Sequence, residues 1–220
     1  DTIAPQASTL GTPSTAMPLA STATLANAND YAPQLATDTE GNWVAVWWSY
    51  YDLVSNASGS TDANIHVARS ADHGATWTAV AALNSTAAAD GNAADLYPVV
   101  TTDAQGHWLA VWESSHDLNG TAGTDFDIFI ARSSDNGASW SDPALVNSGT
   151  SDGTATDRRP QIETDGAGNW LVVWESQFNL GGTAGTDYDL FVSRSSDNGI
   201  TWTAPALLNG TGTLDGSASD

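Results

Sequence analysis

Paired carboxylates are the residues of this sequence whose types and spacing most resemble a set of metal ligands. Two pairs occur at matching places in the chain, Asp125 with Asp127 and Asp187 with Asp189. Residues two apart in a strand lie on the same face, so each pair could hold Ca²⁺ together with carbonyl groups of the Gly-Thr-Ala-Gly-Thr loop before it. No EF-hand calcium loop is present, and solvated carboxylates that cap a strand are the alternative interpretation.

Two glutamates could form the carboxylate pair of a glycosidase. Glu113 follows Trp112 and Glu175 follows Trp174 at matching positions of the chain. Glycoside hydrolysis uses two carboxylates at a defined separation, which a sequence does not supply. Because Trp48 stands at the corresponding earlier position, we expect packed or rim carboxylates here rather than a catalytic pair.

Acidic residues dominate the charge of the chain. It has 26 Asp and Glu residues against five Lys and Arg, a formal net charge of -21 over 220 residues. A field of this sign repels phosphate, so we expect no binding to nucleic acid. The absence of cysteine excludes disulfides and thiol nucleophiles. No apolar run approaches the ~18 residues of a membrane-spanning helix, so membrane insertion is not expected.

A repeat of about 62 residues organises the elements that must position these side chains. One shared block is an octad, which reads SADHGATW from Ser70, SSDNGASW from Ser133 and SSDNGITW from Ser195. A second shared block begins at Pro33, Pro98 and Pro160 and contains WVAVWWS, WLAVWES and WLVVWES. Agreement of both blocks in one register indicates three copies of a single structural unit.

Each repeat shows strand patterns throughout. The first repeat has a short strand at 35–37, a strand at 43–48 that is apolar on both faces, a third at 65–69 and a fourth near 77–83. Four strands joined by hairpin turns describe a propeller blade. The sequence therefore predicts an all-β fold, a β-propeller of four-stranded antiparallel blades. Its three repeats would form a partial propeller or half of a six-bladed ring.

The octads resemble the Asp-box, the bacterial neuraminidase repeat of sialidases and other β-propeller proteins, and the resemblance covers roughly residues 30–210. It implies a turn between the third and fourth strands of each blade, on the rim away from the catalytic face. We expect a structural role, in which the Asp accepts backbone N–H groups, the Gly takes a positive φ and the Trp packs under the hairpin. The residues concerned are Ser70, Asp72, Gly74, Trp77, Ser133, Asp135, Gly137, Trp140, Ser195, Asp197, Gly199 and Trp202.

The resemblance to sialidases does not carry their catalytic residues over to this chain. It implies three arginines that grip the substrate carboxylate, a Tyr nucleophile with a Glu partner, and an Asp acid/base. Arg69, Arg132 and Arg194 share one repeat position, which indicates packing between blades, and only Arg158 and Arg159 are left. The interpretation therefore leans against an enzyme, with no catalytic residue and no cofactor apart from the calcium candidate above.

The function we favour from the sequence is a non-catalytic, exported module that acts in surface binding or assembly. One alternative is a fragment of a sialidase-like glycoside hydrolase. Another is a carbohydrate-binding lectin module that uses aromatic residues of the long loops, such as Tyr50, Tyr51 and Phe178. A composition rich in Thr, Ala, Asp, Asn, Gly and Ser is typical of a secreted or cell-surface bacterial protein.

The repeats also divide the chain and raise the question of closure. We expect a flexible tail or linker at 1–15 and a propeller segment at 16–220, with a stray outer strand near 16–21 and blades at about 31–90, 95–152 and 157–215. Propellers close with about four to eight blades, so we expect further blades from a longer native chain or from a second copy. The faces of an open arc should be partly wet, and the Trp residues expected there are Trp43, Trp47, Trp108, Trp112, Trp170 and Trp174.

Overall fold

The computed structural model describes residues 29–51, 53, 62–87, 90–118, 120–123, 125–147, 154–184 and 187–209. These residues form three four-stranded sheets, and every paired strand is antiparallel to its neighbour. The predicted all-β fold with four-stranded blades is confirmed. The predicted tail at 1–15 and stray strand at 16–21 lie outside the described residues, and the predicted outer bounds of the blades stay a prediction.

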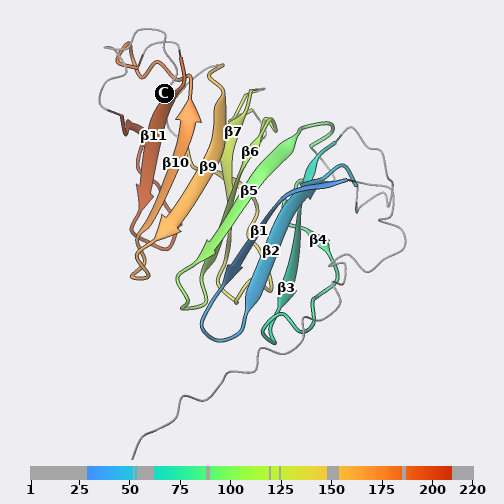
Figure 1. The fold of residues 1–220 in the computed structure, drawn as a ribbon. Helices are drawn as coiled ribbons and strands as arrows, with labels where there is room; N and C mark the ends of the chain where they lie inside the picture. The colour runs from blue at the N-terminus through green and yellow to red at the C-terminus, as the bar shows by residue number, and fades with distance from the viewer. Residues whose placement is uncertain are drawn as a thin grey trace, which may run out of the picture.

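The strands run in chain order across each sheet. Blade 1 contains β1 (Asp30–Thr37), β2 (Trp43–Ser49), β3 (Asn64–Ser70) and β4 (Ala81–Ala82). Blade 2 contains β5 (Asp95–Thr102), β6 (Trp108–Ser114), β7 (Asp127–Ser133) and β8 (Ala144–Leu145). Blade 3 contains β9 (Asp157–Thr164), β10 (Trp170–Ser176), β11 (Asp189–Ser195) and β12 (Ala206–Leu207). The blades stand side by side, with blade 2 between the others and β5 against both β1 and β9 (Figure 1).

The first and fourth strands differ in length from the prediction. The first strand begins at Asp30 instead of the predicted residue 35. Its pairing with β2 continues beyond a register shift between Tyr31 and Gln34. This bulge lets the strand pass Pro33, which has no N–H to give to the ladder. The fourth strand has only Ala81 and Ala82 instead of the predicted 77–83.

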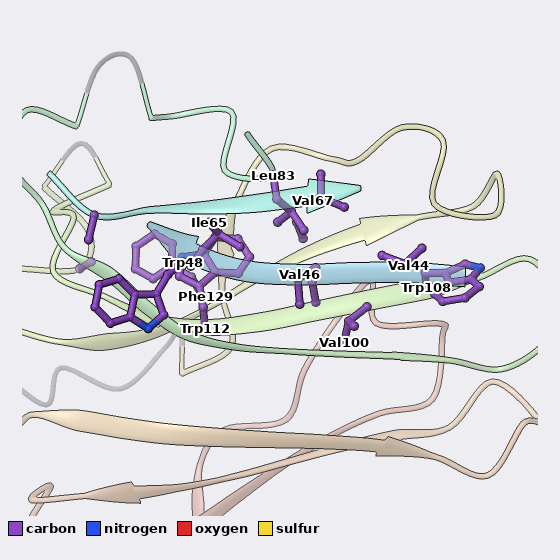
Figure 2. Packing of buried hydrophobic residues seen from close by; sticks show 14 residues of the cluster. Val44, Val46, Trp48, Ile65, Val67, Leu83, Val100, Trp108, Trp112 and Phe129 are labelled. Atoms are coloured by element: carbon purple, nitrogen blue, oxygen red, sulfur yellow. The ribbon is translucent and has the colours of Figure 1, made fainter. Parts of the chain in front are cut away.

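The core lies between the blades. Trp108 and Trp112 of β6 pack in one cluster with Val44 and Val46 of β2, and all four are fully buried (Figure 2). The second interface repeats this arrangement with Trp170 and Trp174 of β10 against Leu109 and Val111 of β6. The second strand of blade 2, β6, therefore buries one face against the preceding blade and the other against the following blade, which explains its apolar residues on both faces.

The prediction of partly wet tryptophans is wrong for most of them. Trp108, Trp112, Trp170 and Trp174 are at most 2% exposed and Trp47 is 6% exposed, while Trp43 is half-buried. The Trp side chains of blades 2 and 3 are buried because they point at the preceding blade and pack against it. The apolar residues exposed at the blade 3 end of the arc include Leu171, Leu190 and Leu208, and Leu35 is exposed at the blade 1 end.

Candidate functional site

The antiparallel ladder places the candidate residues at two opposite ends of the sheets. Trp43, which begins β2, pairs with Ser70, which begins the first octad, whereas Ser49 at the far end of β2 pairs with Asn64. The octads therefore occupy one end of every blade. The acidic pairs, the two candidate glutamates and the starts of β1, β5 and β9 occupy the other end.

The octads form hydrogen-bonded turns, called the octad turns below (70–77, 133–140 and 195–202). Asp72 Oδ1 accepts the Thr76 N–H (2.8 Å) and the Ser70 hydroxyl (2.7 Å), and Asp72 Oδ2 accepts the Thr76 hydroxyl (2.6 Å). Ser70 Oγ in turn accepts the Gly74 N–H (2.9 Å). Bonds from Thr76 hold the pKa of Asp72 down at about 2. The carboxylate thus serves as a turn-forming acceptor, and the other two turns repeat these bonds around Asp135 and Asp197.

The paired carboxylates are engaged by amides. Asp127 and Asp189 are each only 2% exposed, so the interpretation as solvated caps is wrong for these two residues. Asn147 Nδ2 donates to Asp127 Oδ1 (2.6 Å), and Asn209 Nδ2 donates to Asp189 Oδ1 (3.0 Å). Asp187 is 8% exposed, and Asp125 is half-buried. Within the described ranges, no three or more His, Asp or Glu residues gather in a group that could hold a metal ion.

An aromatic cluster lies at the end of the blades opposite the octad turns. The rings of Tyr31 and Trp48 stack with centroids 4.2 Å apart. Tyr50 meets both rings edge-on, at 6.3 Å from Tyr31 and 5.4 Å from Trp48. Tyr97 from blade 2 approaches Trp48 at 6.3 Å and is 47% exposed. The cluster spans the junction of blades 1 and 2 and offers partly open ring faces.

Charged residues continue the same end of the molecule at the next junction. Glu113 is 3% exposed, and its Oε2 accepts the backbone N–H of Arg159 at 2.9 Å. The guanidinium of Arg159 forms an ion pair with Glu175 at 3.2 Å. Burial raises the pKa of Glu113, while the Arg159 N–H and the charges of Arg158 and Arg159 act against the rise. Together with Tyr31, Trp48, Tyr50 and Tyr97, these residues are called the aromatic-acidic end.

One backbone feature positions this end in every blade. Ala32, Tyr97 and Arg159 are equivalent residues, two after the Asp that begins the first strand, and their φ values are 47°, 51° and 51°. Residues other than glycine rarely adopt a positive φ, and such strain clusters at functional sites. At this bulge the Tyr97 side chain is 47% exposed, and the Arg159 N–H donates to Glu113.

Sequence reasoning found part of the aromatic-acidic end. Glu113, Glu175, Tyr50 and the two arginines were singled out, but Tyr31, Trp48 and Tyr97 were not proposed as site residues. A signal for Tyr31 and Tyr97 is present in the sequence, because both lie in a repeated pattern of Asp, two variable residues and Pro. The other predicted loop aromatics are not open to solvent in the same way, since Tyr51 is 1% exposed and Phe178 is half-buried with its ring centroid 6.0 Å from that of Phe191.

Comparison with known proteins identifies the fold. No protein-family model matches the chain, and no curated protein matches it. Among solved structures, a Hadza microbial sialidase superposes with a TM-score of 0.57 at 20% identity, over 80% of this chain and 37% of that one. A leech intramolecular trans-sialidase gives 0.56 at 13% identity, over 84% and 44%.

A third similar structure is the α-L-arabinanase of Penicillium chrysogenum in complex with arabinobiose. Its TM-score is 0.54 at 16% identity, over 81% of this chain and 49% of that one. The chain thus spans less than half the length of each of these three proteins. At such identities the likeness establishes the propeller fold. Among the described residues no helix is long and apolar enough to cross a membrane.

Proposed function

We propose that this chain is a non-catalytic, exported propeller module that binds glycans at its aromatic-acidic end. The observation that carries the proposal is the adjacency of the Tyr31–Trp48 stack and Tyr97 to the Glu113–Arg159–Glu175 cluster on one end of neighbouring blades. Aromatic faces suit the apolar faces of sugar rings, and carboxylates and guanidinium groups suit their hydroxyls. A few placed polar groups beside aromatic side chains are what a small-molecule site requires.

The similar structures support this choice. They include two enzymes named for sialic acid chemistry and an arabinanase that holds arabinobiose. We infer from the octads that the chain is related to Asp-box propellers, in which the octads stabilise the turns. We also infer a secreted or cell-surface location from the composition and from the proposed ligand.

A glycan array followed by calorimetry tests the proposal. We expect the wild-type chain to bind at least one glycan class, and Tyr97→Ala to weaken that binding by about tenfold, because one exposed ring is lost from the platform. Ile200→Ala is the matched control, since Ile200 is 62% exposed but lies in an octad turn at the opposite end. Equal loss in both variants, or no binding on the array, contradicts the proposal.

A second candidate function, glycoside hydrolysis, is favoured by one observation. The buried Glu113 has a raised pKa beside a second glutamate and arginines, an environment that suits a general acid. The test is an assay of fluorogenic glycosides with wild-type, Glu113→Gln and the exposed control Glu40→Gln. Turnover that Glu113→Gln alone abolishes replaces the binding proposal with the enzyme. We expect no turnover above background.

A further inference from the structure

The two blade junctions inside the chain share one contact, called the socket below: an aliphatic side chain of one blade packs over the octad glycine of the next blade. A methyl group on Gly137 of blade 2 would lie 2.5 Å from Cγ2 of Val44 in blade 1. A methyl group on Gly199 of blade 3 would lie at least as close to Cδ2 of Leu109 in blade 2. Both distances are shorter than carbon atoms tolerate, so the octad glycines of blades 2 and 3 each lie under an aliphatic side chain of the preceding blade.

A polar link repeats beside each socket. Asn84 follows β4 of blade 1, and its Nδ2 donates to Oδ2 of Asp95, the first residue of blade 2. Asn147 follows β8 of blade 2, and its Nδ2 donates to Asp157 of blade 3 at 2.7 Å. Both aspartates are buried. Asn209 stands at the same position after β12, where the described chain contains no fourth blade.

Blade 3 exposes the residues that the other blades bury at their junctions. Leu171, Leu190 and Leu208 are 40%, 36% and 54% exposed. Their counterparts in blades 1 and 2 are 0% to 2% exposed. These are Val44 and Leu109 for Leu171, Ile65 and Ile128 for Leu190, and Leu83 and Val146 for Leu208. A groove of about 840 Å³ lies beside Leu171 on this face and is also lined by Val192 and Arg194. We call the face of blade 3 that carries the three leucines the leucine face.

Blade 1 exposes the matching half of a junction. Leu35 is 54% exposed, whereas its counterparts Val100 and Ile162 point at the preceding blade and are 6% and 3% exposed. The octad glycine of this blade, Gly74, has no atom closer than 4.0 Å to the place of an added methyl group. Asp30, the counterpart of the buried Asp95, is exposed. We call this side of blade 1 the socket face.

We propose that the leucine face of one copy docks onto the socket face of a second copy. At both junctions inside the chain, the face of a blade that corresponds to the leucine face is covered by the next blade, whose octad glycine lies in the contact. In the new junction Gly74 of the second copy receives Leu171, and its Asp30 accepts the amide of Asn209. The Ala32 N–H of the second copy donates to Glu175 of the first copy, as the Arg159 N–H donates to Glu113 at the junction of blades 2 and 3. Each copy has both faces, so two three-bladed arcs can satisfy each other and close a ring.

Charge sets the conditions under which the contact forms. Each copy carries a net charge of -21, so two copies repel each other at low ionic strength. About 0.5 M NaCl shortens the screening length to below ~5 Å and leaves the apolar contact of the leucines intact. We therefore expect association to strengthen as NaCl rises.

Light scattering after size exclusion tests the docking on the full chain. In 0.5 M NaCl we expect a particle of about twice the 22.7 kDa chain mass. Leu171→Asp should return the mass to that of one chain, because it places a charge in the junction. Leu171 is 40% exposed in the single chain, so the variant should fold. The control Ile200→Asp adds the same charge to blade 3 away from the leucine face and should leave the mass unchanged.

Gly74→Ala tests the other half of the contact and should also give single chains. Its control is Gly91→Ala, because Gly91 has a similar φ of 77° against 81° and nothing within 4 Å of the added methyl group. The decisive sample mixes Leu171→Asp with Gly74→Ala. One variant keeps an intact socket face and the other an intact leucine face, so the mixture should pair although neither associates alone. A single-chain mass for the wild type, or a dimer that survives Leu171→Asp, overturns the proposal.

Discussion

Arg69 Nε of blade 1 donates to the backbone carbonyl of Asn136 in the octad turn of blade 2 at 2.5 Å, and Arg69 Nη2 donates to Asn42 Oδ1 at 2.8 Å. One side chain therefore joins the start of a second strand to the turn of the following blade. Arg194 holds the same repeat position in blade 3 and is exposed. A comparison of Arg69 with Arg194 therefore separates the effect of the blade junction on stability from the effect of the residue type.

Replacing Arg69 by Met should destabilise the single chain by about 2 kcal/mol, because hydrogen bonds from a charged donor are lost at a junction. Arg194→Met should change the free energy of unfolding by less than about 0.5 kcal/mol. Urea unfolding at low salt and low protein concentration, where copies stay apart, measures both. Equal effects would show that Arg69 does not act through the junction.

The stability of the fold should fall as the pH rises from about 4 to 8. Burial raises the pKa of Asp95 from its ordinary value to about 8, with the charge of Asp90 adding to the effect. A group whose pKa is higher in the folded state stabilises the fold below its unfolded pKa and loses that contribution as the pH rises through the folded pKa. We expect Asp95→Asn, which stays neutral, to flatten the dependence measured by urea unfolding between pH 5 and 9. An unchanged slope would show that Asp95 ionises freely in the folded chain.

The octad aspartates should give the opposite dependence in acid. Burial acts to raise the pKa of Asp135, but hydrogen bonds donated by Ser139 and Ser133 outweigh it and hold the pKa at about 2. The stabilising contribution of Asp135 is therefore present above about pH 4 and lost as the pH falls toward 2. Asp135→Ala should cost about 1–3 kcal/mol at pH 6 and remove part of the acid transition. The control is Asp142→Ala, since Asp142 is exposed and its carboxylate accepts a bond from the Ser85 hydroxyl but takes no part in an octad turn. A larger loss in the control would contradict the assignment.

Sodium chloride should raise the melting temperature of the chain, because screening relieves the repulsion within a domain of net charge -21. Calcium at about 1 mM should add nothing beyond its ionic strength, since Asp127 and Asp189 already accept side-chain amides. Melting curves in EDTA, CaCl₂ and NaCl of matched ionic strength measure both effects. A rise specific to calcium that Asp187→Asn abolishes would restore the metal site predicted from the sequence.

Repeat spacing and alternation were enough to predict the blades. The second strands read as apolar on both faces, and the structure buries β6 between its two neighbouring blades. Local spacing also placed the octads, because the Asp, Ser and Gly of a turn interact within a few residues of one another. The strand that passes Pro33 was read too short, since a bulge is a property of the pairing between two strands.

Tertiary structure alone decided which faces of the blades are covered and which side chains meet. Val44, Leu109 and Leu171 hold one repeat position, yet their exposed fractions are 0%, 0% and 40%. Glu113 and Arg159 are far apart in the chain, and only the packing of β9 against β6 brings them together. The physical reason is that a strand's own residues determine its pleat and its apolar faces, whereas burial and electrostatics depend on the neighbour that lies against each face.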